Sequence, residues 1–366
     1  MGEIRDKAEK KDDGRSTEAG LRQDSDALRG LESKSLGIIM AGLAVVVIAL
    51  VLFALSAGRY QVPLDITAQI LLSPITGQAG DWTSNEYNVV VFVRLPRVIA
   101  AVLIGIALAL SGASYQGVFQ NLLVSPDILG VSYGACVGAA LSILLSLGSW
   151  QTQIFAFLGG LLTVLITVSI PRLMHRRSNI IMVLAGVIVG GFMSSVLGLL
   201  KYVADPETQL PDIVYWQLGS VAKADYGTLS YTAPVIVVAA AVIICMRWRL
   251  NIISLGEQEA QTLGINLRKE RGVIIVASTL LTASAVSISG TIGWVGLIIP
   301  HITRRIVGAD NKRLIPCCTL VAAAFMLIID TIARAASGFE IPLSILTGFV
   351  GAPIFCYILI KQRNQE

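Results

Sequence analysis

Residues Arg247 to Arg271 read RWRLNIISLGEQEAQTLGINLRKER and form a polar island between two long apolar runs. The island is too long and too regular to be a simple connection between two membrane helices. Within it, Ser254 to Leu263 has the pattern of a short capped helix, with Glu257 three residues after Ser254 and Gly264 at the end. Basic flanks predict a cytoplasmic position. The segment is either a helical surface on which a partner acts or an ordinary surface loop with a helical turn, and the residue spacing alone does not decide between these two interpretations.

The composition indicates the class of protein. Of the 366 residues, 54% are hydrophobic and only 14% are charged. Apolar runs recur at the length of about 20 residues that a membrane helix needs. We therefore predict an all-α membrane protein with ten transmembrane helices, over residues 36–57, 96–118, 127–147, 152–171, 179–201, 228–247, 272–290, 292–307, 314–336 and 341–361.

The N-terminal segment has a different composition from the rest. Residues 1–34 hold many charges of both signs and little apolar content, which predicts a disordered cytoplasmic tail. Residues 35–366 form the membrane domain, with a cytoplasmic loop over 248–271. A polar outer loop containing Pro63, Pro74 and Trp82 is expected after the first span.

The distribution of Lys and Arg predicts the orientation, because cytoplasmic loops are enriched in both. Ten spans with both termini inside place 14 basic residues in inner loops, before the tail is counted: Arg172, Arg176, Arg177, Arg247, Arg249, Arg268, Lys269, Arg271, Arg304, Arg305, Lys312, Arg313, Lys361 and Arg363. The outer side holds six: Arg59, Arg94, Arg97, Lys201, Lys223 and Arg334. Both termini are therefore expected in the cytoplasm.

Several motif searches narrow the chemistry. The sequence contains no G-x-x-x-x-G-K-[ST] and no H-E-x-x-H. Its two histidines, His175 and His301, have no ligand spacing, so no metal site is predicted. The G-x-S-x-G match at 130–134 falls within a predicted membrane helix, whereas a serine hydrolase needs that motif on a strand-to-helix turn. An intramembrane enzyme is thereby disfavoured.

Other polar and small residues inside the spans have structural readings. Asp330 is the only acidic residue well inside a predicted span, and it shares a helical turn with Arg334, which disfavours an ion-coupled secondary transporter. Two small-xxx-small pairs, Gly134 with Gly138 and Gly186 with Gly190, predict close helix packing. Buried structural thiols are expected for all five cysteines: Cys136, Cys245, Cys317, Cys318 and Cys356.

A series of short motifs is spread along about residues 36–363. They are Arg94-Leu95-Pro96-Arg97, Ser111-Gly112-Ala113, Gln116-Gly117, Phe119-Gln120-Asn121, Ser125 through Val131, Trp216 through Ser220, Leu255-Gly256-Glu257, Leu263-Gly264-Ile265, Gly296 through His301, Asp330 through Arg334 and Gly351-Ala352-Pro353. This set resembles the FecCD family of ABC-transporter permeases, which import iron-siderophore complexes, haem and cobalamin. The sequence departs from the family at Leu122, where proline usually follows the asparagine, and this leaves the inner turn undefined.

The resemblance implies a type II ABC importer permease fold in the inner (cytoplasmic) membrane of a prokaryote. It implies as partners a second permease copy, as a homodimer or a paralogous heterodimer, two ATP-binding subunits, an extracytoplasmic binding protein and membrane lipid, but no nucleic acid. The chain would not be an enzyme and would bind no cofactor, since ATP and Mg would bind the partner ATPase. An iron-siderophore chelate is the expected cargo, with haem or cobalamin as the alternative.

The resemblance also implies roles for three groups of residues. ATPase coupling falls on Leu255, Gly256, Glu257, Ala260, Leu263 and Gly264. Docking of the binding protein falls on Arg94, Arg97 and Arg334, for which lipid anchoring and a local Asp330–Arg334 ion pair are the structural alternatives. The inner gate falls on Asn121, Leu122 and Leu123, where Asn121 could instead hydrogen-bond the backbone of the turn.

Overall fold

The computed structural model describes residues 36–77, 80–174, 179–256 and 266–363. The chain divides into two units, Met1–Val45 and Val46–Glu366, and the helix Leu36–Ser56 crosses the division. Of the first unit, residues 36–45 are described, and they are helical. The predicted tail of residues 1–34 lies outside the described residues.

All regular structure in the described ranges is helical. After the first helix the elements are α2 (Leu64–Thr76), α3 (Ser84–Asn88), the π-helical η1 (Val89–Arg94), α4 (Leu95–Phe119), the 3-10 helix η2 (Pro126–Leu129), α5 (Val131–Leu144), α6 (Ser149–Leu173), α7 (Asn179–Val203), α8 (Gln209–Leu218), α9 (Tyr226–Cys245), α10 (Arg247–Leu255), α12 (Leu267–Ser289), α13 (Val295–Val307), α14 (Asn311–Ala335) and α15 (Leu343–Arg363).

Each of the ten predicted spans coincides with one described helix, which confirms the all-α membrane fold. Within the described ranges, seven helices are long and apolar enough to cross a membrane, with α3, η1 and α4 forming one continuous helix, Ser84–Phe119. In contrast, α5 and α13 have only 14 and 13 residues. They are too short to cross a bilayer core alone, because a crossing takes about 20 helical residues.

Three helices were not predicted. The expected polar outer loop contains α2, which buries Thr67 and Ile70 and ends at Gly77 in a left-handed conformation. The α8 helix follows α7, and α10 occupies the start of the polar island. All three are short and mixed in polarity, so a search for long apolar runs does not detect them.

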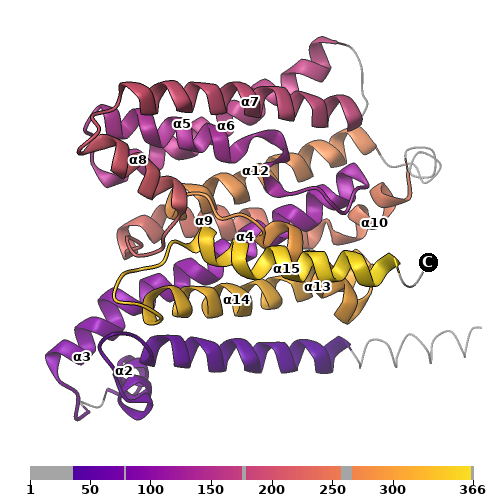
Figure 1. Cartoon of the computed structure of the whole chain (residues 1–366). Coiled ribbons are helices and arrows are strands. Elements are labelled where there is room, and N and C mark those ends of the chain that lie inside the picture. Colours follow the sequence, from indigo (N-terminus) through magenta and orange to yellow (C-terminus); the bar gives the residue numbers. More distant parts are fainter. Residues whose placement is uncertain (1–35, 78–79, 175–178, 257–265, 364–366) are drawn as a thin grey trace, which may run out of the picture. The chain divides into compact units, whose positions relative to one another are not determined.

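Two neighbouring helices, α4 and α12, lie between the group α5–α7 and the group α13–α15 (Figure 1). Their contact is polar as well as apolar: the Ser111 hydroxyl donates to the carbonyl of Ser278 at 3.1 Å and lies 2.8 Å from the Thr282 hydroxyl. Small hydroxyl-bearing residues allow two helices to approach closely in a membrane protein. This contact places α4 and α12 at the centre of the Val46–Glu366 unit.

Glycines permit the closest approaches. A Cβ atom at Gly112 of α4 would lie 1.8 Å from the carbonyl oxygen of Gly296 in α13. Likewise, a Cβ at Gly138 of α5 would lie 2.0 Å from the carbonyl oxygen of Phe155 in α6. Contacts this short are impossible for any residue with a side chain, so these positions need glycine.

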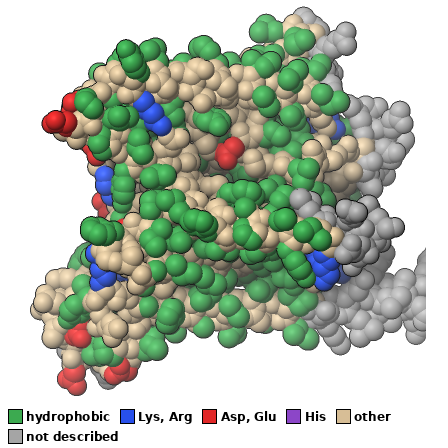
Figure 2. Space-filling model, in the orientation of Figure 1, with side chains coloured by type: hydrophobic (Ala, Val, Ile, Leu, Met, Phe, Trp, Pro, Cys, Tyr) green, Lys and Arg blue, Asp and Glu red, His purple; other side chains and the backbone are tan. Residues whose placement is uncertain are grey.

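The outer surface of the Val46–Glu366 unit has the polarity of a membrane protein. Hydrophobic side chains cover the middle of the visible face, and most charged side chains lie toward its ends (Figure 2). Cys136, Cys317 and Cys318 are buried as predicted. Cys245 and Cys356 are exposed, so the prediction of five buried thiols is wrong for two of them. Both lie on helix faces that this chain leaves uncovered.

Candidate functional site

The three arginines predicted at the outer end belong to one buried network. Arg97, near the start of α4, is 9% exposed, and its Nε donates to Asp330 Oδ1 of α14 at 2.8 Å. Its Nη2 also donates to Glu340 Oε1 at 2.8 Å. The hydroxyl of Ser220 donates to the same Glu340 oxygen at 2.9 Å. Arg97 therefore joins α4 to α14 and to the segment that precedes α15.

Arg94 and Arg334 bind backbone carbonyls at the end of the first helix. The Nη1 of Arg94 donates to the carbonyls of Leu55 and Ser56, each at 2.7 Å, and its Nη2 donates to the carbonyl of Tyr60. Arg334 donates to the carbonyl of Ala57 at 2.7 Å and to that of Ala54. The carbonyls of Ala54, Leu55 and Ser56 belong to the last turn of the helix, where intrahelical donors are lacking, and those of Ala57 and Tyr60 belong to the segment that follows it.

The structure brings Arg94, Arg97 and Arg334 together, as the docking hypothesis requires, but it places them below the surface of this chain. Arg94 is only 4% exposed, and the Arg334 side chain is 11% exposed. The Asp330–Arg334 ion pair that their spacing predicts is present, at 3.5 Å. Glu340 and Ser220 were missed, although an acidic residue between two apolar runs is a signal of an internal ion pair.

At the opposite end of α4, the predicted gate residues form a tight, exposed turn. The α4 helix ends at Gln120, which is left-handed with a φ of 52°. Asn121 Oδ1 then accepts a hydrogen bond from the backbone N–H of Leu123 at 2.9 Å, so the backbone role considered for Asn121 is confirmed. Leu122 and Leu123 are 44% and 59% exposed. Two exposed leucines at a turn provide an apolar surface without a partner in the described chain.

The start of the polar island differs from its prediction. Ser254 was expected to cap a following helix, but it lies inside α10 and its hydroxyl donates to the carbonyl of Leu250 at 2.8 Å. The α10 helix ends at Gly256, whose φ of 125° favours glycine. Of the coupling residues, Glu257, Ala260, Leu263 and Gly264 lie outside the described residues. Leu255 is the last residue of α10, and its side chain is not described.

A side chain from the inner turn reaches the end of α10. Gln120 Nε2 donates to the carbonyl of Ile253 at 3.1 Å and to that of Ser254 at 3.4 Å. These carbonyls lie in the last turn of α10, where intrahelical donors are lacking. Gln120 directly precedes the predicted gate at Asn121, and Ser254 directly precedes the predicted coupling segment at Leu255. The side chain of Gln120 therefore connects the two segments.

The other side of α10 is attached to α14. Asn251 Nδ2 donates to Asp310 Oδ1 at 2.5 Å, and its Oδ1 accepts from the backbone N–H of Asn311 at 2.8 Å. Burial acts to raise the pKa of Asp310, but hydrogen bonds from Asn251 and Lys312, with the nearby cations Lys312 and Arg313, hold it below its usual value. A charged Asp310 at the N-cap keeps α10 and α14 together at neutral pH.

The sequence of the chain is similar to those of known transport proteins. Residues 45–361 match the model of the FecCD transport family. The molybdate import permease MolB of Haemophilus influenzae is 38% identical over 326 residues, which cover 89% of this chain and 96% of the relative. A probable iron chelatin permease of Helicobacter pylori is 35% identical over 276 residues, covering 75% and 83%.

A solved structure shares the fold as well as the sequence. It is an inward-facing ABC transporter assigned to the metal-chelate type, with a TM-score of 0.79 and 35% identity over 89% of this chain and 99% of the other. The family match, the relatives and the shared fold show that the chain is an integral membrane permease subunit of an ABC importer. The chain belongs to the FecCD transport family.

Proposed function

We propose that this permease transports an iron-siderophore-type metal chelate inward, receiving it from an extracytoplasmic binding protein. Two copies of the chain, or this chain and a paralogue, form the pathway between them in the cytoplasmic membrane of a prokaryote. Two separate subunits bind ATP and Mg and hydrolyse the ATP, while this chain binds no cofactor and catalyses no reaction. The absence of a nucleotide-binding motif from the sequence supports this division of labour.

The observation that supports the mechanism best is the contact of Gln120 with the end of α10. A partner that displaces the segment after α10 displaces the carbonyls of Ile253 and Ser254, to which Gln120 is hydrogen-bonded. The left-handed turn at Gln120 transmits that displacement to Asn121 and Leu123. Closure of the ATPase subunits would in this way open or close the apolar turn, as a rigid-body transition.

We expect Gly256→Val to reduce transport by about tenfold or more, while the ATP hydrolysis of the complex continues. At a φ of 125° a β-branched residue is strained by about 1–3 kcal/mol, so the backbone at position 256 has to change its conformation at the end of α10. The measurement compares ATP-driven uptake with ATPase rate in proteoliposomes. Gly293→Val is the control, because a Cβ at Gly293 meets nothing within 4 Å. Wild-type uptake by Gly256→Val protein would contradict the coupling role.

We also propose that Arg94, Arg97 and Arg334 mark the docking area of the binding protein. Acidic residues of that protein would compete with Asp330 and Glu340 for Arg97 and with Asp330 for Arg334, and with backbone carbonyls for Arg94. A charged partner would then loosen the contact between α4 and the segment before α15.

The proposal also specifies the substrate, for which two candidates have support. A relative named for iron chelatin favours the metal chelate, with haem and cobalamin as other chelates of the kind this family imports. Molybdate is the second candidate, because the MolB relative is 38% identical and is named for it. We expect the complete transporter in proteoliposomes to take up a radiolabelled ferric siderophore when ATP is inside. Uptake of molybdate alone would exclude the chelate and support the second candidate.

A further inference from the structure

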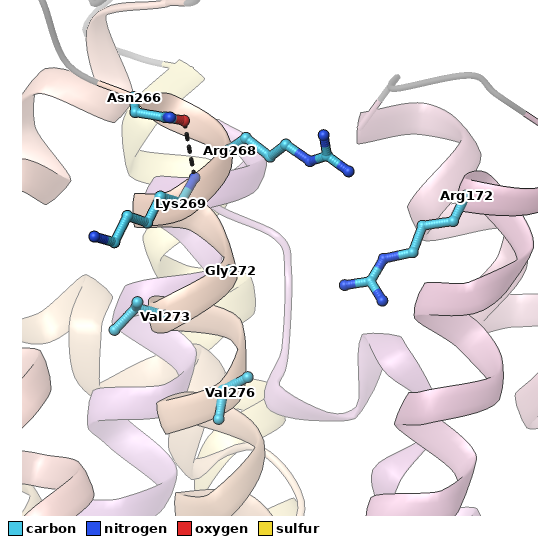
Figure 3. A pocket seen from close by; sticks show the side chains of 7 residues that line it. All are labelled: Arg172, Asn266, Arg268, Lys269, Gly272, Val273 and Val276. Carbon is cyan, nitrogen blue, oxygen red and sulfur yellow. Dashed lines mark hydrogen bonds between the residues drawn. The ribbon is translucent and has the colours of Figure 1, made fainter.

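A basic cavity lies between the end of α6 and the beginning of α12. Its volume is about 500 Å³, and its lining residues are Arg172, Asn266, Arg268, Lys269, Gly272, Val273 and Val276. Arg172 and Arg268 project toward each other across the gap from α6 and α12 (Figure 3). Lys269 projects from the other flank of α12 in the same view. Two guanidinium groups therefore converge on the gap between the helices, and a third cation lies on the opposite flank of α12.

No carboxylate among the described lining residues neutralises these cations. The neighbouring acid, Glu270, has a side chain that is 10% exposed and forms an ion pair with Arg249. The cavity also lies at the N-terminus of α12, where Asn266 Oδ1 accepts from the backbone N–H of Lys269 at 3.2 Å. A helix N-terminus adds positive potential to that of the side chains. Two guanidinium groups that converge without a counter-charge provide a site for an anion.

The remaining lining residues indicate what kind of anion. Gly272, Val273 and Val276 follow Lys269 at helical spacing along one side of α12, and the two valines are 39% and 60% exposed. Seven residues of helix extend about 10 Å, so this apolar floor runs from the charged opening toward the membrane interior. A soluble anion would gain nothing from contact with these apolar side chains. A phospholipid would bind both parts of the cavity, because its phosphate lies at the membrane surface and its acyl chains lie deeper.

We propose that this cavity, formed by Arg172, Arg268 and Lys269 above Gly272, Val273 and Val276, binds an anionic phospholipid of the inner leaflet. The guanidinium groups of Arg172 and Arg268 bind the headgroup phosphate, and Lys269 adds charge at the other flank. One acyl chain lies along Val273 and Val276. The lipid bridges the charged ends of α6 and α12, two helices that the sequence separates.

The test measures retained lipid by native mass spectrometry on the full-length permease in nanodiscs of mixed phosphatidylglycerol and phosphatidylcholine. The wild-type protein is expected to prefer phosphatidylglycerol. The double variant Arg172→Gln/Arg268→Gln should reduce that preference by roughly 10- to 30-fold, because each juxtamembrane cation changes anionic-lipid binding by about fivefold. Lys312→Gln, an exposed cation at the start of α14, is the charge-matched control and should leave the preference unchanged.

A second variant tests the apolar floor without changing charge. A Cβ at Gly272 meets nothing within 4 Å, so Gly272→Leu fills the groove while leaving the internal packing intact. It should also abolish the preference, whereas Gly198→Leu, at an equally open position of α7, should not.

Three results would each overturn the proposal. The first is an unchanged lipid preference in both the double variant and Gly272→Leu. The second is displacement of phosphatidylglycerol by millimolar inorganic phosphate, which would mean a soluble-anion site. The third is its displacement by added ATPase subunits, which would mean a protein contact.

Discussion

Replacing Asp330 by alanine is expected to lower the free energy of unfolding by about 3–5 kcal/mol. The Asp330 side chain is 1% exposed and is paired with both Arg97 and Arg334. Its loss leaves two buried guanidinium groups to share Glu340, and a buried cation without a counter-charge is strongly unfavourable. The measurement is detergent-induced unfolding of the purified protein in mixed micelles, with Glu207→Ala, an exposed acid at the same end, as the control.

The free energy of unfolding of Asp330→Asn should lie between those of the wild type and Asp330→Ala, because the amide keeps the side-chain volume and one acceptor oxygen. A change below about 0.5 kcal/mol for Asp330→Ala, equal to that of an exposed position, would contradict a structural role for the network. The same network complicates tests of docking. Arg97→Ala leaves Asp330 without its closest partner, so weakened docking in that variant has to be compared with its stability before it is attributed to a lost contact.

Gly186→Ala is expected to destabilise the protein by about 1–3 kcal/mol, whereas Gly190→Ala should cost less than about 0.5 kcal/mol. Both glycines belong to one small-xxx-small pair on α7. A Cβ at Gly186 would lie 2.0 Å from the carbonyl oxygen of Ile128, which is backbone and cannot move aside easily. At Gly190 the nearest atom is Cδ2 of Tyr133 at 3.6 Å, an ordinary contact.

The measurement is the thermal unfolding temperature of the two variants in the same detergent. Both variants carry the same substitution on the same helix, so each serves as the control for the other. Equal destabilisation by both would contradict the packing of α7 on η2. A stabilised Gly190→Ala would fit the structure, since alanine restricts the unfolded chain more than glycine does.

The sequence predicted the position of each of the ten helices because their signal is local: the length and hydropathy of a segment identify it as an apolar helix. The Asp330–Arg334 pair was also predictable, since four residues along a helix bring two side chains together. The Arg97–Asp330 contact was not, because 233 positions separate the two residues. That pairing depends on how α4 and α14 pack, which no periodicity in either helix specifies.

The polar island shows the same limit at short range. A helix was predicted over Ser254 to Leu263, of which residues 257–263 lie outside the described residues, whereas α10 begins at Arg247 and ends before Gly256, so Ser254 lies inside it. A serine followed three residues later by glutamate suits a helix start, and only the left-handed conformation at Gly256 shows that a helix ends there. Similarly, the cavity beside Arg172 and Arg268 joins elements whose proximity the sequence does not reveal.

The continuous helix Ser84–Phe119 has 36 residues, which corresponds to about 54 Å of length. The hydrocarbon core takes up about 30 Å of this. At the N-terminal end of the helix, Thr83 and Glu86 form an exposed capping box. Arg94 and Arg97 lie within this one continuous helix, so its length and rotation fix where both side chains lie relative to the capping box and to Phe119. Inserting one residue between Arg97 and Phe119 would therefore move both arginines by about 1.5 Å along the helix axis and rotate them by about 100° around it.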